Sequence, residues 1–228
     1  MRIEQLILHT GKLSSLKDFY KIKLGMNVTG ETANSFTIQT SSTNIIFNLS
    51  TGLQNPFYHF AFNIPENQFM EAKNWAKERV ELISLNGEDE FDFKNWNAHS
   101  LYFYDLSGNI IELIARHNLK NSSVKKFTGK SLLNVSEIGF PVHDVKKFYD
   151  ILNDNFNIPS FGGDMKTFTA AGDDEGLFII VPGGRKWFPD CQDAQIFPLT
   201  AKIISNEDKD LSFEDLPYRI ISVRVVTS

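Results

Sequence analysis

The amino-acid sequence predicts an α+β fold built of tandem βαβββ modules. Three observations support this prediction. The spacing of apolar residues changes from the period of a strand to that of a helix and back again within each module of roughly 55 residues. Glycine and polar turn residues separate the short strands. The same order of elements then starts again twice along the 228 residues, a length that can bury a core without a metal or a disulfide.

The first module covers residues 1–52. Side chains alternate along its opening strand, so Ile3, Gln5 and Ile7 share one face. Apolar residues recur at helical spacing over residues 13–24, and a glycine that favours the end of a helix follows them. Three short β-like runs complete the module, at residues 26–30, 35–39 and 44–49.

The second module covers residues 57–117. Its first strand is predicted at residues 57–64 and contains His59, and its helix begins after Pro65. Gly108 is free to adopt positive φ in the turn of the last hairpin. The three strands of this module are predicted at residues 80–84, 98–104 and 109–115.

Residues 118–130 are polar and are predicted to be a linker. Residues 131–228 contain a third, more divergent βαβββ-like unit and two additional apolar strands, which could form half of a further module. An odd number of modules would leave one sheet unpaired, so this part of the chain is alternatively an interaction element that forms a homodimer. The third unit comprises a strand at 133–142, a helix at 145–156 and strands at 166–171 and 177–181, and the additional strands are at 197–205 and 218–226.

Composition excludes several classes of protein. A net charge of -5 and a pI near 5.6 argue against a nucleic-acid-binding surface. No apolar stretch approaches the roughly 20 residues that span a membrane. Cys191 is the single cysteine, so no intrachain disulfide can form and a reducing compartment, the cytoplasm, is expected.

The segments HFAFNIPENQFMEAKNWAKERV and HSLYFYDLSGNIIELIAR resemble the second module of the vicinal oxygen chelate superfamily. This superfamily includes glyoxalase I, bleomycin-resistance proteins and extradiol ring-cleaving dioxygenases. The segment IEQLILHTGKLSSLKDFYKIKLG resembles the opening strand and helix of its first module, whereas SEIGFPVHDVKKFYDIL matches only weakly. The resemblance implies that modules 1–52 and 57–117 pair, and that their curled sheets form a half-barrel cleft that holds a metal ion.

The resemblance places Gln5, His59 and Glu112 at three of the four metal-ligand positions of such a cleft. The fourth position corresponds to Phe47 or Asn48 and offers no carboxylate. One imidazole, one carboxylate and one amide oxygen form a rather hard donor set, which favours Fe or Mn, with Ni or Zn as alternatives.

The resemblance also identifies Tyr102 as a group that could hydrogen-bond a substrate oxygen. His99 and His9 could be further donors behind the metal ligands. The resemblance implies a ring-cleaving dioxygenase, or a glyoxalase-like lyase, acting on a small oxygenated substrate such as a catechol. The alternative is a protein that binds and sequesters a small molecule without catalysis, as bleomycin-resistance proteins do.

Each of these residues also has a purely structural interpretation. A histidine in a buried strand is commonly a hydrogen-bonded core residue, and Gln5 could be a satisfied polar residue in a cleft wall. Glu112 lies between two apolar neighbours, where a carboxylate is costly to bury unless it is paired, and Arg116 is its alternative partner. Residues 183–187 (GGRKW) could bind an anion or simply form a turn.

Overall fold

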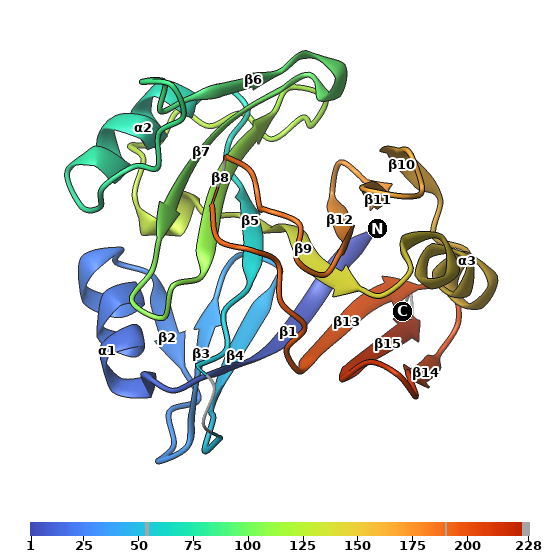
Figure 1. Cartoon of the computed structure of the whole chain (residues 1–228). Helices are drawn as coiled ribbons and strands as arrows, with labels where there is room; N and C mark the ends of the chain where they lie inside the picture. The colour runs from blue at the N-terminus through green and yellow to red at the C-terminus, as the bar shows by residue number, and fades with distance from the viewer. Residues whose placement is uncertain (53–54, 190, 225–228) are drawn as a thin grey trace.

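The strands of the protein form two sheets, which we call sheet A and sheet B (Figure 1). The computed structural model describes residues 1–52, 55–189 and 191–224. Sheet A has the order β14-β15-β13-β1-β4-β3-β2, and sheet B has the order β10-β11-β12-β9-β5-β8-β7-β6.

The strands of sheet A are β1 (Arg2–Thr10), β2 (Asn27–Thr29), β3 (Ser35–Gln39), β4 (Asn44–Leu49), β13 (Leu199–Ser205), β14 (Lys209–Ser212) and β15 (Tyr218–Arg224). The strands of sheet B are β5 (His59–Asn63), β6 (Phe91–Phe93), β7 (Ala98–Tyr104), β8 (Ile110–Arg116), β9 (Asn134–Val142), β10 (Ser160–Gly163), β11 (Thr169–Asp173) and β12 (Gly176–Pro182).

Three α-helices accompany the sheets: α1 (Leu13–Asp18), α2 (Phe69–Lys77) and α3 (Val145–Phe156). Shorter helical turns are η1 (Phe19–Lys23, of the π type), η2 (Lys94–Trp96) and η3 (Gly129–Ser131). Among the described residues, no helix is both long and apolar enough to cross a membrane.

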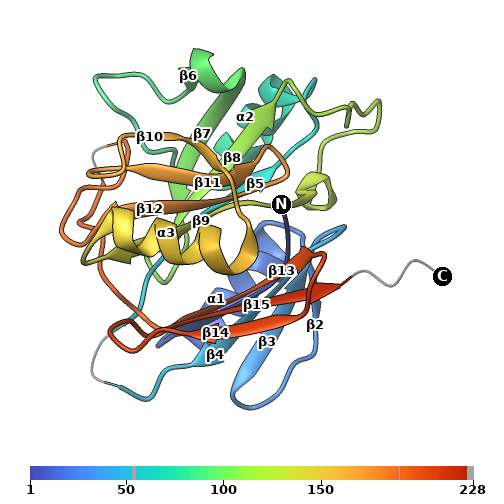
Figure 2. The same cartoon turned by 90° about the vertical axis from the view of Figure 1, so that its right-hand side faces the viewer.

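The two sheets pack back to back, with α3 between them (Figure 2). Asp144 caps the first turn of α3 by accepting a hydrogen bond from the backbone N–H of Lys147 at 2.9 Å. On the buried face of the helix, the Phe148 ring lies 5.4 Å from Phe140 of β9 and 6.0 Å from Tyr218 of β15. The helix therefore joins the two sheets through one aromatic cluster. The opposite face of each sheet does not pack against this helix.

The pairing of modules differs from the expectation. Modules 1–52 and 57–117 were expected to share a cleft, but the strands of the first lie in sheet A and those of the second in sheet B. The second module pairs with the third through β5 and β9, and the first pairs with the C-terminal strands through β1 and β13. The C-terminal strands thus supply a fourth strand unit, and the third module has a partner within the chain.

Several elements also differ locally. Residues 80–84, which were expected to form a strand, contribute only an isolated bridge between Leu82 and Phe103, and the edge strand of this module is β6 instead. The strands β10 and β14 were not predicted, because both are short and poor in apolar residues. The predicted residues Val225 and Val226 lie outside the described part of the chain. Residues 117–128 contain neither a strand nor a helix, as described by the structure, in agreement with the prediction for this segment.

Candidate metal site

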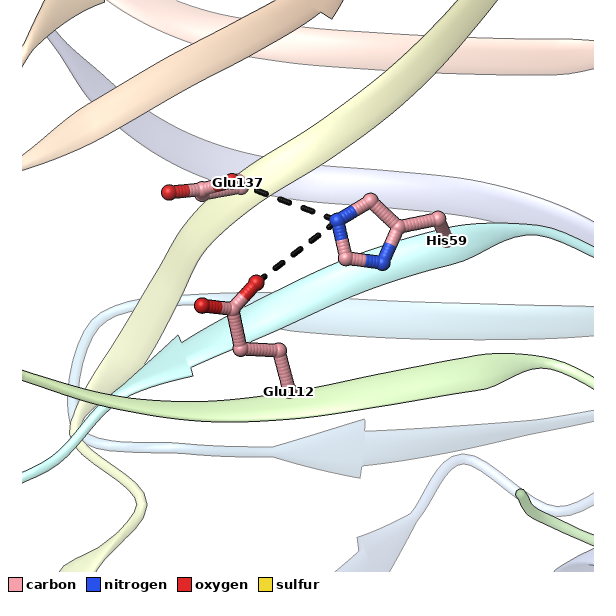
Figure 3. A group of neighbouring side chains, drawn as sticks. All are labelled: His59, Glu112 and Glu137. Atoms are coloured by element: carbon pink, nitrogen blue, oxygen red, sulfur yellow. Dashed lines mark ion pairs between the residues drawn. The ribbon is translucent and has the colours of Figure 1, made fainter. Parts of the chain in front are cut away.

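Three buried side chains converge on the concave face of sheet B: His59, Glu112 and Glu137. His59 begins β5, and β5 pairs with both β8 and β9. Ala61, two residues after His59 on the same face, is opposite Glu112 on one side and Glu137 on the other. Register alone therefore brings the three side chains together, and one potential ligand atom from each lies within 4.8 Å of the others (Figure 3).

The imidazole ring of His59 is oriented by a hydrogen bond to the backbone of β8. Nδ1 lies 3.2 Å from the carbonyl oxygen of Ile110, which can only accept, so Nδ1 carries the proton. Nε2 then presents its lone pair to the carboxylates, at 3.7 Å from Glu112 Oε2 and 4.0 Å from Glu137 Oε2. Burial lowers the pKa of His59 to about 4, so the ring is neutral at physiological pH. A neutral imidazole oriented through its other nitrogen is the form that binds metal ions.

The two carboxylates interact unfavourably in the absence of a cation. Burial, and then the neighbouring Glu137, raise the pKa of Glu112 to about 8. Burial also raises the pKa of Glu137, and the guanidinium of Arg116 opposes that rise. Two buried carboxylates and an imidazole lone pair within a few ångströms form a site that a divalent cation would stabilise.

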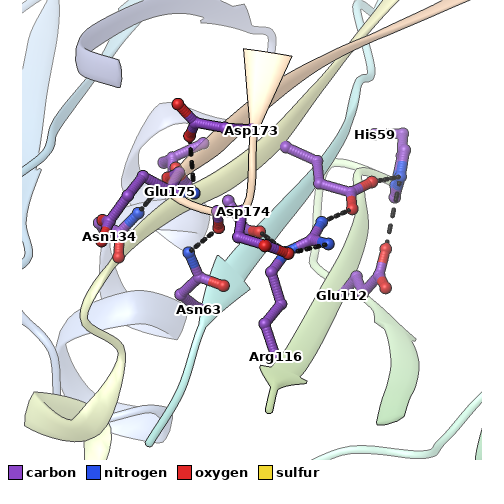
Figure 4. A network of polar contacts seen from close by, with 11 residues as sticks. His59, Asn63, Glu112, Arg116, Asn134, Asp173, Asp174 and Glu175 are labelled. Atoms are coloured by element: carbon purple, nitrogen blue, oxygen red, sulfur yellow. Dashed lines mark hydrogen bonds and ion pairs between the residues drawn. The ribbon is translucent and has the colours of Figure 1, made fainter. Parts of the chain in front are cut away.

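Arg116, whose guanidinium lies beside Asp174 in Figure 4, fixes the orientation of Glu137. Its side chain is fully buried and donates a short hydrogen bond to Glu137 Oε1, while Nε donates to the hydroxyl of Ser136 at 3.0 Å. Asp174 lies 3.6 Å from the other terminal nitrogen. Oε1 of Glu137 is thus occupied, and Oε2 is the atom that faces His59. Arg116 was the alternative partner of Glu112 in the sequence, but the carboxylate with which it forms a hydrogen bond is that of Glu137.

The three side chains form the floor of a pocket of about 310 Å³. Its wall is largely aromatic. The indole of Trp187 lies 5.0 Å from the His59 ring and packs so closely on Gly139 that a Cβ there would approach it to 2.6 Å. The remaining lining residues are Phe93, Trp96, Tyr102, Phe168, Phe188, Ile179 and Arg185.

The structure brings together only some of the residues expected from the sequence. Tyr102 lines the pocket, with its ring 6.3 Å from that of His59. Burial, and then Glu112, raise the pKa of the Tyr102 hydroxyl well above its ordinary value, so it keeps its proton and can donate. His99 points to the opposite face of β7, where its Nδ1 lies 2.8 Å from Nε2 of His117. His99 is therefore outside the pocket.

Gln5 lies in sheet A and is not a neighbour of His59. It pairs with Asn44 of β4 and Lys202 of β13. The expected fourth position, Phe47 or Asn48, is also in β4 of sheet A, and Phe47 is buried in the core. Gln5 and the fourth position lie away from the candidate metal site because of the pairing of modules, which puts β1 and β5 in different sheets.

Glu137 takes the place that Gln5 was expected to fill, and sequence reasoning missed it. The signal was present: Glu137 is an isolated carboxylate in a predicted apolar strand, which is the same observation that identified Glu112. The pseudo-twofold relation between β5 and β9 places Ile179 of β12 at the fourth position, because Ile179 pairs with Gly139 as Glu112 pairs with Ala61. Ile179 cannot bind a metal.

Paired modules whose curled sheets enclose a cleft define the vicinal oxygen chelate fold, and this chain has that fold. No protein-family model matches the sequence, and no curated protein matches it. Among solved structures, a "putative dioxygenase" from Bacillus subtilis subsp. subtilis str. 168 is similar with a TM-score of 0.65 and 12% identity, covering 97% of this chain and 85% of that chain. Glyoxalase I from Zea mays is similar with a TM-score of 0.58 and 11% identity, covering 98% of this chain and 92% of that chain.

Proposed function

We propose that this protein is a metal-dependent enzyme that acts on a small oxygenated compound in the pocket of sheet B. The observation that carries the proposal is the convergence of His59, Glu112 and Glu137 in a buried pocket, with the histidine lone pair already turned toward both carboxylates. An imidazole and two carboxylates suit hard or borderline ions, so Fe²⁺ or Mn²⁺ is the expected metal, with Ni²⁺ or Zn²⁺ as alternatives.

The remaining residues of the pocket have defined tasks in this proposal. A bound divalent ion would supply Lewis acidity and leave open positions for the oxygens of a substrate. Tyr102, which keeps its proton, would donate a hydrogen bond to one of those oxygens. Trp187 and Phe188 would exclude water and contact the apolar part of the substrate.

We favour oxidative ring cleavage over isomerisation. Isomerisation through an enediolate requires a base next to the substrate carbon. The fourth ligand position, at which a carboxylate could serve as that base, is occupied by Ile179. Ring cleavage of a catechol instead breaks one ring carbon–carbon bond and places both atoms of O₂ in the product, so O₂ is the only co-reactant.

Metal content tests the proposal. We expect untagged wild-type protein, loaded anaerobically with Fe²⁺ or Mn²⁺ and then desalted, to retain near-stoichiometric metal by elemental mass spectrometry. The variants His59→Ala, Glu112→Gln and Glu137→Gln should lose it, because each removes one of the three candidate ligands. Gln5→Ala is the matched control in sheet A and should retain the metal.

Oxygen consumption with catechol and hydroquinone, compared with conversion of the glutathione adduct of methylglyoxal, then separates the two reactions. A wild-type protein that retains no metal would contradict the proposal. Equal metal loss in Gln5→Ala would contradict the assignment of the ligands.

A further inference from the structure

We propose that the substrate of this pocket carries a carboxylate on its ring and that Arg185 binds it. The inference rests on the proposed function, because it names the class of substrate for the same site. It assigns a role to Arg185 in the segment GGRKW, of which only Trp187 has been given one so far.

The main chain holds Arg185 at the pocket. Its backbone N–H donates to the carbonyl of Pro182 at 3.2 Å, and its carbonyl accepts from the N–H of Ala194 at 2.7 Å. Gly184 adopts a φ of 83°, which permits the tight turn directly after β12. The side chain leaves this turn to line the pocket whose floor is the candidate metal site.

The guanidinium of Arg185 is positioned but has hydrogen-bonding capacity to spare. Its central carbon lies 5.6 Å from the ring of Phe168, another wall residue, and contact with the face of a ring leaves the N–H groups at its edge available. Among the described residues, none forms an ion pair or a side-chain hydrogen bond with it. Its neighbour Lys186 pairs with Asp193 at 3.4 Å, and Arg116 is bound to Glu137.

The charges of the loaded pocket then favour an anion. Glu112 and Glu137 would balance a divalent cation, and Asp174 lies 3.6 Å from Arg116. Arg185 would therefore be the uncompensated charge among the lining residues. A guanidinium binds a carboxylate through two parallel hydrogen bonds. A pocket of about 310 Å³ is at the small end for ligand sites and fits one ring with small substituents. The substrate class that satisfies these conditions is a single-ring aromatic carboxylate.

Two pairs of probes test this inference by calorimetry. Mn²⁺-loaded protein is titrated anaerobically with 3,4-dihydroxybenzoate and with its neutral methyl ester, and metal-free protein is titrated with benzoate and with benzamide. We expect wild type to bind each carboxylate about tenfold more tightly than its neutral partner, the size of a hydrogen bond to a charged group. Arg185→Gln should abolish that preference, whereas Lys186→Gln, the matched control one residue away, should keep it.

The two proposals fail in different ways. Equal binding of acid and ester, or an Arg185→Gln variant that weakens both alike, would overturn the role of Arg185 while the metal site stands. If neither dihydroxy compound binds the Mn²⁺-treated protein, the proposed function fails, and the benzoate and benzamide titrations still decide the role of Arg185. Absence of any preference for benzoate would then overturn it.

Discussion

Sheets A and B are built alike, yet within the described part of the chain only sheet B carries a candidate metal site. Each sheet joins two units through an antiparallel pair of first strands, β1 with β13 in one and β9 with β5 in the other. Each pair contains one irregularity of register, where Glu4 of β1 and Ser136 of β9 are left without an opposite residue. Aligning these two bulges matches the sheets residue by residue.

The alignment shows which residues stand at the ligand positions of each sheet. Gln5 corresponds to Glu137, Thr200 to His59, Ile221 to Glu112 and Ile46 to Ile179. The backbone of sheet A is therefore suited to hold the same side-chain arrangement, but its residues offer no imidazole and no carboxylate. Fold alone does not create a metal site, and the donors are a separate property of the sequence.

The concave faces also differ in how far they are covered. The segment between β12 and β13 places Trp187 and Phe188 over sheet B, and Glu112 and His59 are only 2% and 6% exposed. The corresponding residues of sheet A are all partly exposed. Burial under this cover shifts the pKa values in sheet B, because it is the first cause of the shift for each of the three candidate ligands.

The largest contrast between the sheets should appear when a carboxylate is removed. Glu137→Ala would leave the buried Arg116 without its main partner and should lower the free energy of unfolding of the metal-free protein by about 3 kcal/mol. Gln5→Ala, at the matching position of sheet A, should change it by less than about 0.5 kcal/mol. Urea unfolding measures both. A comparable loss in the two variants would show that the cover of sheet B has no energetic consequence at this position.

A smaller contrast is expected at Gly139, which corresponds to Ile7 of sheet A. An added methyl group at Gly139 would force Trp187 away and should cost about 1 to 3 kcal/mol of unfolding free energy. Ile7→Val, where no indole lies above the strand, should cost under about 0.5 kcal/mol. Urea unfolding gives the energies, and a shift of tryptophan emission in Gly139→Ala alone would report the displaced indole. Unchanged emission would mean that Trp187 does not rest on Gly139 in solution.

The pH dependence of metal binding should be the most gradual effect. Metal must displace the proton of Glu112, whose pKa is raised to about 8, so apparent affinity should rise up to tenfold per pH unit below that value and level off above it. His59, with a pKa lowered to about 4, is already neutral across this range and adds no proton. Mn²⁺ titrations at several pH values in weak buffer measure the affinity and the proton released. Affinity that does not vary with pH would contradict the protonated state of Glu112.

The raised pKa of Glu112 affects the stability of the metal-free protein in the opposite direction: stability should fall, not rise, with increasing pH. The pKa of Glu112 is higher in the folded chain than in the unfolded chain, so its contribution is lost as pH rises toward about 8. His59 contributes in the other direction only as pH falls below the ordinary histidine value of about 6.5. Between about pH 6.5 and about pH 8 the metal-free protein should become less stable as pH rises. The variant Glu112→Gln should reduce this dependence of stability on pH.

Much of the fold could be predicted from sequence because it depends on local pattern. The apolar pattern identified the opening strand β1, and it placed β7 and β8 to within one residue at each end; helical spacing identified α3. Pairing of the units could not be predicted in the same way, since β1 and β13 meet across most of the chain and their alternating patterns would suit several partners equally. The expectation that modules 1–52 and 57–117 pair was therefore wrong.

The candidate site residues within one module could be predicted, whereas those that depend on the pairing of modules could not. The family resemblance placed His59 and Glu112 together, and they do meet, because they lie in parallel, adjacent strands of one module. Gln5 was assigned to the site only through the expected pairing, and it moved to the other sheet when that pairing changed. Glu137 had the same local signal as Glu112, but nothing in the sequence pattern showed that β9 would lie beside β5. His99 was placed on the wrong face, although its odd position relative to Tyr102 in β7 already separated the two.

The nesting of one sheet within the sequence of the other has a consequence for how the chain folds. Every strand of sheet B lies within residues 59–182, whereas sheet A requires Arg2 to pair with Ile204. Closing that long loop has a larger entropic cost and slows the step that depends on it. We therefore expect sheet B to form first, with its pocket shaped before the central pair of sheet A closes. Hydrogen-exchange labelling during refolding would then protect β5 and β8 ahead of β1 and β13.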